Sequence, residues 1–241
     1  DYIIILTTFL LALTGLAMLA SASSDLGQFK FQDSYFYLKH QILYGLIFGL
    51  VGFLAASKFY YRYYQNFAIP LLLFTFLILI LIFTPLGITS GGASRWLKIG
   101  SLIFQPSEIL KITFIIYLAS WLSKKSGRAE NFWAGYLPFL IICGFTALLL
   151  ILQPSTSTAA ILMVTALIVY FQSGAKFYYI ITTLVLGLIG LLIISYLTPY
   201  RWERLTTFFN PEINTQSSAY QINQALIAIG SGGFWGVGFG Q

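Results

Sequence analysis

Residues 2–24 read YIIILTTFLLALTGLAMLASASS, an apolar stretch that carries no charged side chain between Asp1 and Asp25. A helix needs about 20 apolar residues to cross the hydrocarbon core of a bilayer, so this stretch is long enough to span a membrane. It lacks the basic segment that begins a cleavable signal peptide, and further apolar runs follow, such as the one between Arg62 and Arg95. We therefore expect a retained transmembrane helix at residues 3–22.

The composition extends this prediction to the whole chain. Of the 241 residues, 58% are hydrophobic and 8% are charged, whereas about a quarter of the residues in soluble proteins are charged. The fold class is therefore predicted to be all-α, a polytopic transmembrane helix bundle in a single transmembrane domain over residues 1–241. The apolar runs place about seven helices, at residues 3–22, 41–57, 67–86, 109–122, 136–152, 155–172 and 177–197.

Several function classes are excluded by the residues that the chain lacks. A single cysteine, Cys143, allows no intrachain disulfide and no cysteine-based metal cluster. The glycine run GSGGFWGVGFG at residues 230–240 is not a nucleotide loop, because that motif requires a preceding strand and a following helix. The chain has no Walker lysine motif and no HExxH, and its one histidine, His40, is expected near the boundary of the second helix. No residue pattern identifies a cofactor, and a divalent cation is left open.

The net charge of +6 comes from basic residues that are scattered among loops. An anionic membrane or an anionic lipid is therefore a better partner than nucleic acid, which would require a clustered basic face. A cytoplasmic amino terminus would place Lys58, Arg62, Lys124, Lys125, Arg128 and Lys176 in inner loops, and Lys30, Lys39, Arg95, Lys98, Arg201 and Arg204 in outer loops. The inner loops are shorter, and positive charge in short loops orients a membrane protein, so we predict this orientation. The outer arginines then need another explanation, such as binding of a ligand.

Residues 91–111 read GGASRWLKIGSLIFQPSEILK, a polar loop that runs into the fourth predicted helix. We expect this helix to begin at Pro106, which suits a first helical turn, with Glu108 near the positive end of the helix dipole. Glu108 and Lys111 then share a helix face and can pair, and ionisable groups at the start of a membrane helix favour a functional site. A structural ion pair, with Trp96 as an interfacial anchor, would explain the same residues.

Two further outer segments carry polar residues. Residues 153–158 read QPSTST and supply hydroxyl groups, but a tight turn between two helices is sufficient to explain them and is the favoured interpretation. In the long segment 198–241, Arg201 and Arg204 are spaced to grip a phosphate through bidentate guanidinium contacts. The alternative is that Glu203 and Glu212 neutralise the two arginines.

Taken together, these segments resemble the SEDS family of RodA-like and FtsW-like proteins. The resemblance is carried, in order along the chain, by GLAMLASASS at residues 15–24, GGASRWLKIGSLIFQPSEILK at 91–111, PYRWERLTTFFNP at 199–211 and AYQINQALIAIGSGGFWGVGFG at 219–240. It covers nearly the whole chain. It implies a bundle of about ten helices in the full family fold, with residues 198–241 as the start of a large extracytoplasmic loop.

The resemblance implies a peptidoglycan glycosyltransferase in the cytoplasmic membrane of a bacterium, which polymerises lipid II at the outer face during cell elongation or division. A class B penicillin-binding protein is the implied partner. The pyrophosphate leaving group of lipid II would require cations where its charge develops. The candidate substrate-binding residues are Arg95, Trp96, Lys98, Glu108, Lys111, Arg201, Arg204, Tyr220 and Gln221.

The general base is expected outside this sequence. In the family, an implicated aspartate follows the glycine-rich stretch, so we expect it beyond Gln241, in a chain shortened at its carboxyl end. Glu108 is assigned to positioning or ion pairing rather than to proton transfer. The chain also departs from the family at Ser155, where an acidic residue is usual. Two alternatives therefore stay open, a lipid II flippase and a noncatalytic scaffold of the cell-wall machinery.

Overall fold

The computed structural model describes residues 2–90, 93–100, 102–199, 201–202, 206, 220–234, 236 and 238. The chain divides into two compact units, one formed by residues 1–59 and 194–241 and the other by residues 60–193. The prediction that residues 1–241 form one transmembrane domain, in which 198–241 begin an extracytoplasmic loop, stays a prediction.

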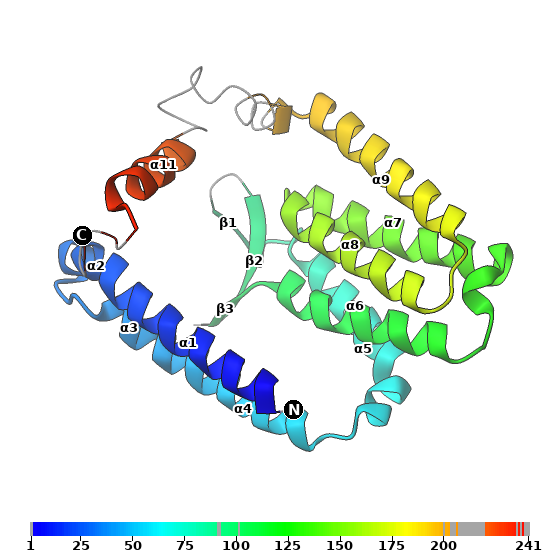
Figure 1. The fold of residues 1–241 in the computed structure, drawn as a ribbon, viewed down its shortest axis with the longest axis horizontal. Helices are drawn as coiled ribbons and strands as arrows, with labels where there is room; N and C mark the ends of the chain where they lie inside the picture. Colours follow the sequence, from blue (N-terminus) through cyan, green and yellow to red (C-terminus); the bar gives the residue numbers. More distant parts are fainter. Residues whose placement is uncertain are drawn as a thin grey trace. The chain divides into compact units, whose positions relative to one another are not determined.

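The first unit begins with two long apolar helical segments (Figure 1). Helix α1 (Tyr2–Ala22) is followed by the short α2 (Ser24–Phe31). A continuous segment, Phe36–Lys58, then combines α3 (Phe36–His40), the π-helical η1 (Gln41–Leu46) and α4 (Ile47–Lys58). Almost none of the residues of the two segments is buried, as expected for helices that face lipid. Near the end of the chain, the same unit contains α11 (Tyr220–Gly232).

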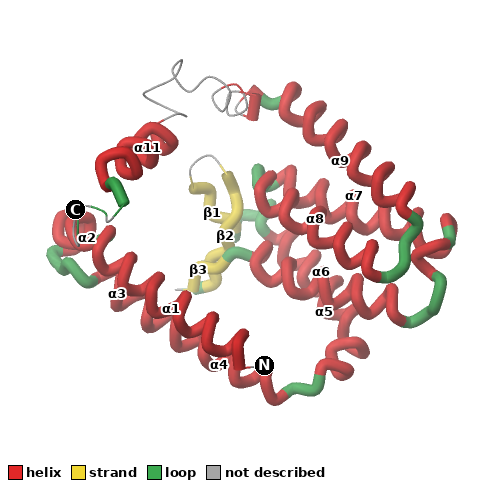
Figure 2. The backbone as a smooth tube through the Cα atoms, viewed as in Figure 1, coloured by secondary structure: helices red, strands yellow, loops and turns green. Residues whose placement is uncertain are grey.

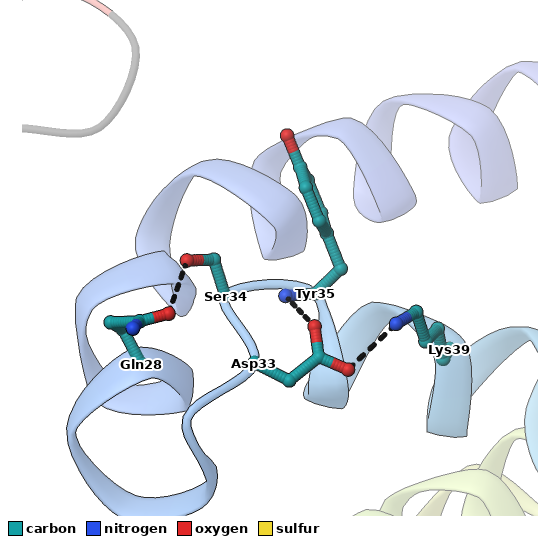
Figure 3. A network of polar contacts seen from close by, with 5 residues as sticks. All are labelled: Gln28, Asp33, Ser34, Tyr35 and Lys39. Carbon is teal, nitrogen blue, oxygen red and sulfur yellow. Dashed lines mark hydrogen bonds and ion pairs between the residues drawn. The ribbon is translucent and has the colours of Figure 1, made fainter.

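A polar network closes the turn between α2 and α3 (Figure 3). The Oδ2 atom of Asp33 forms an ion pair with Lys39 Nζ at 2.6 Å, and Oδ1 accepts a hydrogen bond from the Tyr35 amide at 3.0 Å. Ser34 Oγ donates to Gln28 Oε1 at 3.1 Å. The Lys39 hydrogen bond, followed by the Tyr35 amide, lowers the pKa of the Asp33 carboxyl. The Asp33 carboxyl therefore stays ionised, and the turn is polar between two apolar segments.

The second unit is a helical bundle with a shared core. Its helices are α5 (Tyr61–Leu81), α6 (Pro106–Ser123), α7 (Leu137–Leu152), α8 (Thr156–Gln172) and α9 (Phe177–Leu197), of which α9 ends in the first unit. Helix α6 packs against α5 and α8, and α8 packs against α7 (Figure 2). Phe114 and Leu118 of α6, Phe139 of α7 and Leu162 of α8 are fully buried in this core. A buried hydrogen bond of 3.1 Å from Thr113 Oγ1 to Thr75 Oγ1 also joins α6 to α5.

All seven predicted helices are present within the described residues, and the start of α6 at Pro106 is confirmed. One position was wrong, because the helix expected at residues 67–86 is α5, at Tyr61–Leu81. Thr84 precedes Pro85, and a residue before proline disfavours helical backbone. Helix α5 therefore ends before the apolar run does. Within the described part of the chain, five helical segments are long and apolar enough to cross a membrane: Tyr2–Ala22, Phe36–Lys58, Tyr61–Leu81, Phe132–Leu152 and Phe177–Leu197.

The expected polar loop before α6 contains a small antiparallel sheet that the sequence did not predict. Its strands are β1 (Gly87–Ser90), β2 (Ala93–Ile99) and β3 (Leu102–Phe104), in the order β1-β2-β3. Leu97 anchors the sheet, because it pairs with both Gly87 and Phe104 and is 1% exposed. Glycine is required at position 87, where a Cβ atom would collide with the Ile82 carbonyl oxygen. This close approach fixes the sheet to the end of α5.

Candidate functional site

Arg95 occupies an irregular position in the sheet. Ile88 of β1 pairs with Trp96 and the next residue, Thr89, pairs with Ser94, so Arg95 is an extra residue without a partner in the register. Such a β-bulge bends its strand and redirects a side chain, and bulges are common beside active sites. The bulge therefore gives the Arg95 side chain a direction that a regular strand would not.

The Arg95 guanidinium binds the turn between α7 and α8, which is the QPSTST segment. Its Nε atom donates to the Gln153 carbonyl oxygen at 3.4 Å, and an Nη atom donates to the Pro154 carbonyl oxygen. These carbonyls follow the end of α7, where a helix leaves carbonyl groups unpaired and favours a positive charge. Arg95 thus joins two segments that lie far apart in the sequence, and its side chain is half-buried in doing so.

The same turn is held from two other sides. The Gln153 side chain is 1% exposed, and its Nε2 atom donates to the Leu79 carbonyl oxygen of α5 at 3.1 Å. The Ser155 amide donates to the Leu150 carbonyl of α7 at 2.9 Å. Ser155 Oγ donates to Thr158 Oγ1 in the first turn of α8 at 3.0 Å and is buried. The turn is therefore fixed by β2, α5 and its own helices.

The predicted pairing at the start of α6 is present. Lys111 Nζ lies 2.7 Å from Glu108 Oε2, and the two side chains are 36% and 57% exposed. Beside them, Gln105 Nε2 donates to Ser107 Oγ at 2.9 Å. Both charged groups remain accessible to solvent, so each can also contact a ligand. The spacing of three residues was sufficient to predict this geometry from the sequence.

The sheet end of the bundle, defined as residues 87–111 and 153–158, brings together two of the three predicted outer segments. Strand β2 contacts α6, and Arg95 contacts the turn before α8. Trp96 is 39% exposed and Lys98 is exposed on the same strand. Within the described residues, no group of three His, Cys, Asp or Glu side chains is arranged to hold a metal ion.

The remaining predicted residues belong to the first unit or lie outside the described residues. Arg201 is half-buried, and its Nη1 atom donates to Thr198 Oγ1 at 3.3 Å. Tyr220 begins α11 and is exposed. Arg204 and the side chain of Gln221 lie outside the described part of the structure.

Sequence reasoning missed the part that Gln153 plays. The predicted tight turn at residues 153–158 is present, but the sequence identified only its hydroxyl groups as polar contacts. The structure also uses the Gln153 amide and two main-chain carbonyls to fix the turn. The available signal was a glutamine at the end of an apolar run, directly before a proline. A buried polar side chain needs a hydrogen-bond partner, and the partner of Gln153 is the main-chain carbonyl of Leu79.

Comparison with known proteins identifies relatives over the whole chain. A family model described as "Cell cycle protein" and named for FtsW, RodA and SpoVE matches residues 1–241. A Geobacter sp. (strain M18) protein named "Probable peptidoglycan glycosyltransferase FtsW" is 35% identical over 100% of this chain and 66% of its own length. Stage V sporulation protein E of Bacillus subtilis (strain 168) is 32% identical over the same shares. The chain thus spans just under two thirds of the length of these curated relatives.

Solved structures share the fold. A variant of the rod shape determining protein RodA of Thermus thermophilus, with one aspartate replaced by alanine, superposes with a TM-score of 0.57 at 26% identity, covering 76% of this chain and 59% of that one. A chain from a peptidoglycan synthase complex gives a TM-score of 0.66 at 24% identity, covering 92% and 66%. The protein is therefore a polytopic, helical membrane protein, as its composition predicted.

Proposed function

We propose that this chain, which belongs to the FtsW, RodA and SpoVE family of cell cycle proteins, is a peptidoglycan glycosyltransferase. Its substrate would be lipid II, which it polymerises. The reaction joins the disaccharide of one lipid-linked molecule to the next and releases undecaprenyl pyrophosphate. The protein would act in the cytoplasmic membrane of a bacterium, with the sheet end facing outward. The function serves cell elongation or division, and the residues do not separate the two.

The observation that carries this proposal is the ordered cationic site at the sheet end. A pyrophosphate leaving group gains negative charge as its bond to the sugar breaks, and fixed cations stabilise that charge most when they do not have to reorganise. Arg95 is held by two carbonyls and Lys111 by Glu108, so both cations are already in place. Lys98 is exposed on β2 and adds a third positive charge.

The residues of the site take different roles in this proposal. Arg95 has five N–H donors and uses two of its nitrogens on the turn, so it positions residues 153–158 and keeps donors for a phosphate oxygen. Lys111 contacts the pyrophosphate directly. Glu108 orients Lys111 through their ion pair. No described residue is assigned as the general base, which the family resemblance places after the glycine-rich stretch.

Charge distribution along the helices favours polymerisation over transport of the lipid. Helices α7, α8 and α9 contain no charged residue, and the charges of α6 lie in its first two turns. A flippase requires polar or charged groups along a path through the membrane. We also propose a class B penicillin-binding protein as partner, since the chain shares its fold with a subunit of a peptidoglycan synthase complex.

Polymerisation of fluorescently labelled lipid II by the full-length protein tests this function. We expect Lys111→Ala to lower the rate on the order of 100-fold, the cost of losing one positioned stabilising group. Arg95→Ala should also lower the polymerisation rate. Arg95→Lys should not restore the rate, because one ammonium cannot reproduce the guanidinium geometry. Lys30→Ala on α2 is the matched control and should retain activity.

Three results would contradict the proposal. Normal activity of both Arg95→Ala and Lys111→Ala would remove the site assignment. Movement of lipid II across liposomes without polymer formation would identify a transporter, and a wild-type complex that binds its partner but makes no polymer would identify a scaffold.

A further inference from the structure

The end of the second unit opposite the sheet carries a second cluster of cations. Helix α5 begins beside Arg62, ends at the sheet, and is one of the segments apolar enough to cross a membrane. Its 21 residues give a length of about 31 Å, close to the thickness of the hydrocarbon core. The sheet end and the opposite end are therefore far enough apart to reach opposite membrane interfaces. We define this opposite end as the basic end, with residues Arg62, Lys124, Lys125, Arg128 and Lys176.

Hydrogen bonds bring the start of α5 to the end of α6. Gln65 Nε2 donates to Ser123 Oγ at 3.5 Å, and Ser120 Oγ donates to the Gln65 carbonyl at 3.3 Å. Arg62 lies one turn before Gln65, and Lys124 directly follows Ser123. Both cations are therefore at the same end of the bundle.

Aromatic contacts bring the other basic residues to the same end. Tyr170 near the end of α8 donates its hydroxyl to the Ala129 carbonyl at 2.7 Å, next to Arg128. Tyr136 stacks on Tyr179 of α9, with ring centroids 4.2 Å apart. Lys176 lies three residues before Tyr179, and its carbonyl accepts the Tyr179 amide at 2.9 Å. The start of α5, the α6–α7 turn and the α8–α9 turn thus contribute cations to the same end of the bundle.

The surroundings of these cations are those of a lipid headgroup region. Exposed aromatic side chains lie close in sequence to each basic segment: Tyr61, Tyr63, Trp133, Phe177 and Tyr178. Aromatic belts of this kind mark the membrane interface. Among the described residues of the basic end, Glu130 is the single carboxylate in the segment 124–136. A positive surface at headgroup depth fits an anionic lipid better than a soluble ligand.

Arg128 provides a fixed element in this surface. Its Nη1 atom donates to the Trp121 carbonyl oxygen, and its guanidinium lies 5.4 Å from the centre of the Trp121 ring. The guanidinium is therefore oriented before any ligand binds, and it keeps donors for a bidentate phosphate contact. Lys124 and Lys125 are exposed on the adjacent turn.

We propose that the basic end binds the phosphate headgroup of an anionic phospholipid, with Arg128 as the fixed contact and Lys124 and Lys125 as mobile ones. The lipid would hold the α6–α7 turn at the interface away from the sheet end. This inference is independent of the glycosyltransferase proposal, because it rests on the opposite end of the bundle and is tested by lipid binding.

Native mass spectrometry of the full-length protein, titrated with phosphatidylglycerol or with neutral phosphatidylcholine, tests the inference. We expect phosphatidylglycerol to bind preferentially, and the double variant Lys124→Gln with Lys125→Gln to weaken it by about fivefold for each lysine removed. Arg128→Lys should also weaken binding, since a single ammonium makes no bidentate contact. The matched control is Lys30→Gln on α2, compared with Lys124→Gln alone, because each removes one charge from an exposed position; Lys30→Gln should leave affinity unchanged.

Three outcomes would overturn the inference. Phosphatidylcholine could bind as tightly as phosphatidylglycerol, or the double lysine variant could bind phosphatidylglycerol as the wild type does. Inorganic phosphate could compete as effectively as the lipid, which would identify a soluble-anion site. Thermal unfolding of each variant in neutral detergent separates loss of binding from loss of fold, because Lys124 and Lys125 are exposed and their removal should leave the unfolding temperature unchanged.

Discussion

The two ends of the second unit carry charges of the same sign but hold them differently. At the sheet end, Arg95 binds two main-chain carbonyls and Lys111 pairs with Glu108. At the basic end, Arg128 is held by the Trp121 carbonyl, but Lys124 and Lys125 are exposed in a short turn. Cations fixed by the protein suit the stabilisation of charge that develops during a reaction. Exposed cations in a short loop suit attraction to a membrane surface. The count of charges alone would not separate these two uses.

Replacement of Gln153 should have the largest effect on stability. Gln153→Leu removes the side-chain donor of the Leu79 carbonyl, which keeps only a long hydrogen bond of 3.4 Å from the Ile82 amide. Loss of a buried hydrogen bond of this kind costs about 1–3 kcal/mol. The free energy of unfolding in detergent measures this loss. The turn that Arg95 binds would also shift, so the proposed polymerisation activity should fall with it. Gln172→Leu, at an exposed position at the end of α8, is the control. If both variants lose the same free energy of unfolding, the loss in Gln153→Leu does not come from its buried hydrogen bond.

A smaller effect is expected at the basic end from Tyr170→Phe. The variant removes the hydroxyl that donates to the Ala129 carbonyl and should destabilise the protein by about 1 kcal/mol. Polymerisation should be unchanged, because the lost bond lies at the other end of the bundle. Thermal unfolding and lipid II polymerisation, measured on the same preparation, test both statements. Tyr63→Phe on exposed α5 surface is the matched control. Loss of activity with Tyr170→Phe would mean that the two ends are coupled.

The smallest change in stability is expected from Glu108→Gln. Its ion pair with Lys111 is substantially exposed, and such pairs contribute about 0–1 kcal/mol. The proposed activity should nevertheless fall, because Lys111 loses the group that orients it. A denaturation midpoint near that of the wild type, together with reduced turnover, would support positioning. If turnover is unchanged, the ion pair is structural, which is the alternative that the sequence left open.

The helical part of the fold was predictable because its signal is local. Uncharged runs of sufficient length define spans in a bilayer, and they identified all seven helices within the described residues, although α5 begins and ends earlier than expected. Pro106 and the spacing of Glu108 and Lys111 predicted both the start of α6 and the ion pair. The three-stranded sheet was missed, since its strands are short and its Arg95 bulge interrupts the alternation that identifies a strand.

The sequence by itself determined that this protein is a membrane-spanning helical bundle, and its ordered motifs pointed to the family. Hydrophobicity and the spacing of residues along one helix are properties of neighbouring residues, so they can be read without the fold. Only the tertiary structure decided that Arg95 binds the turn at Gln153 and Pro154, and that Gln153 reaches α5. Those contacts end on main-chain carbonyls. Every residue has such a carbonyl, so no side-chain pattern in the sequence marks the partner, and packing alone brings the two segments together.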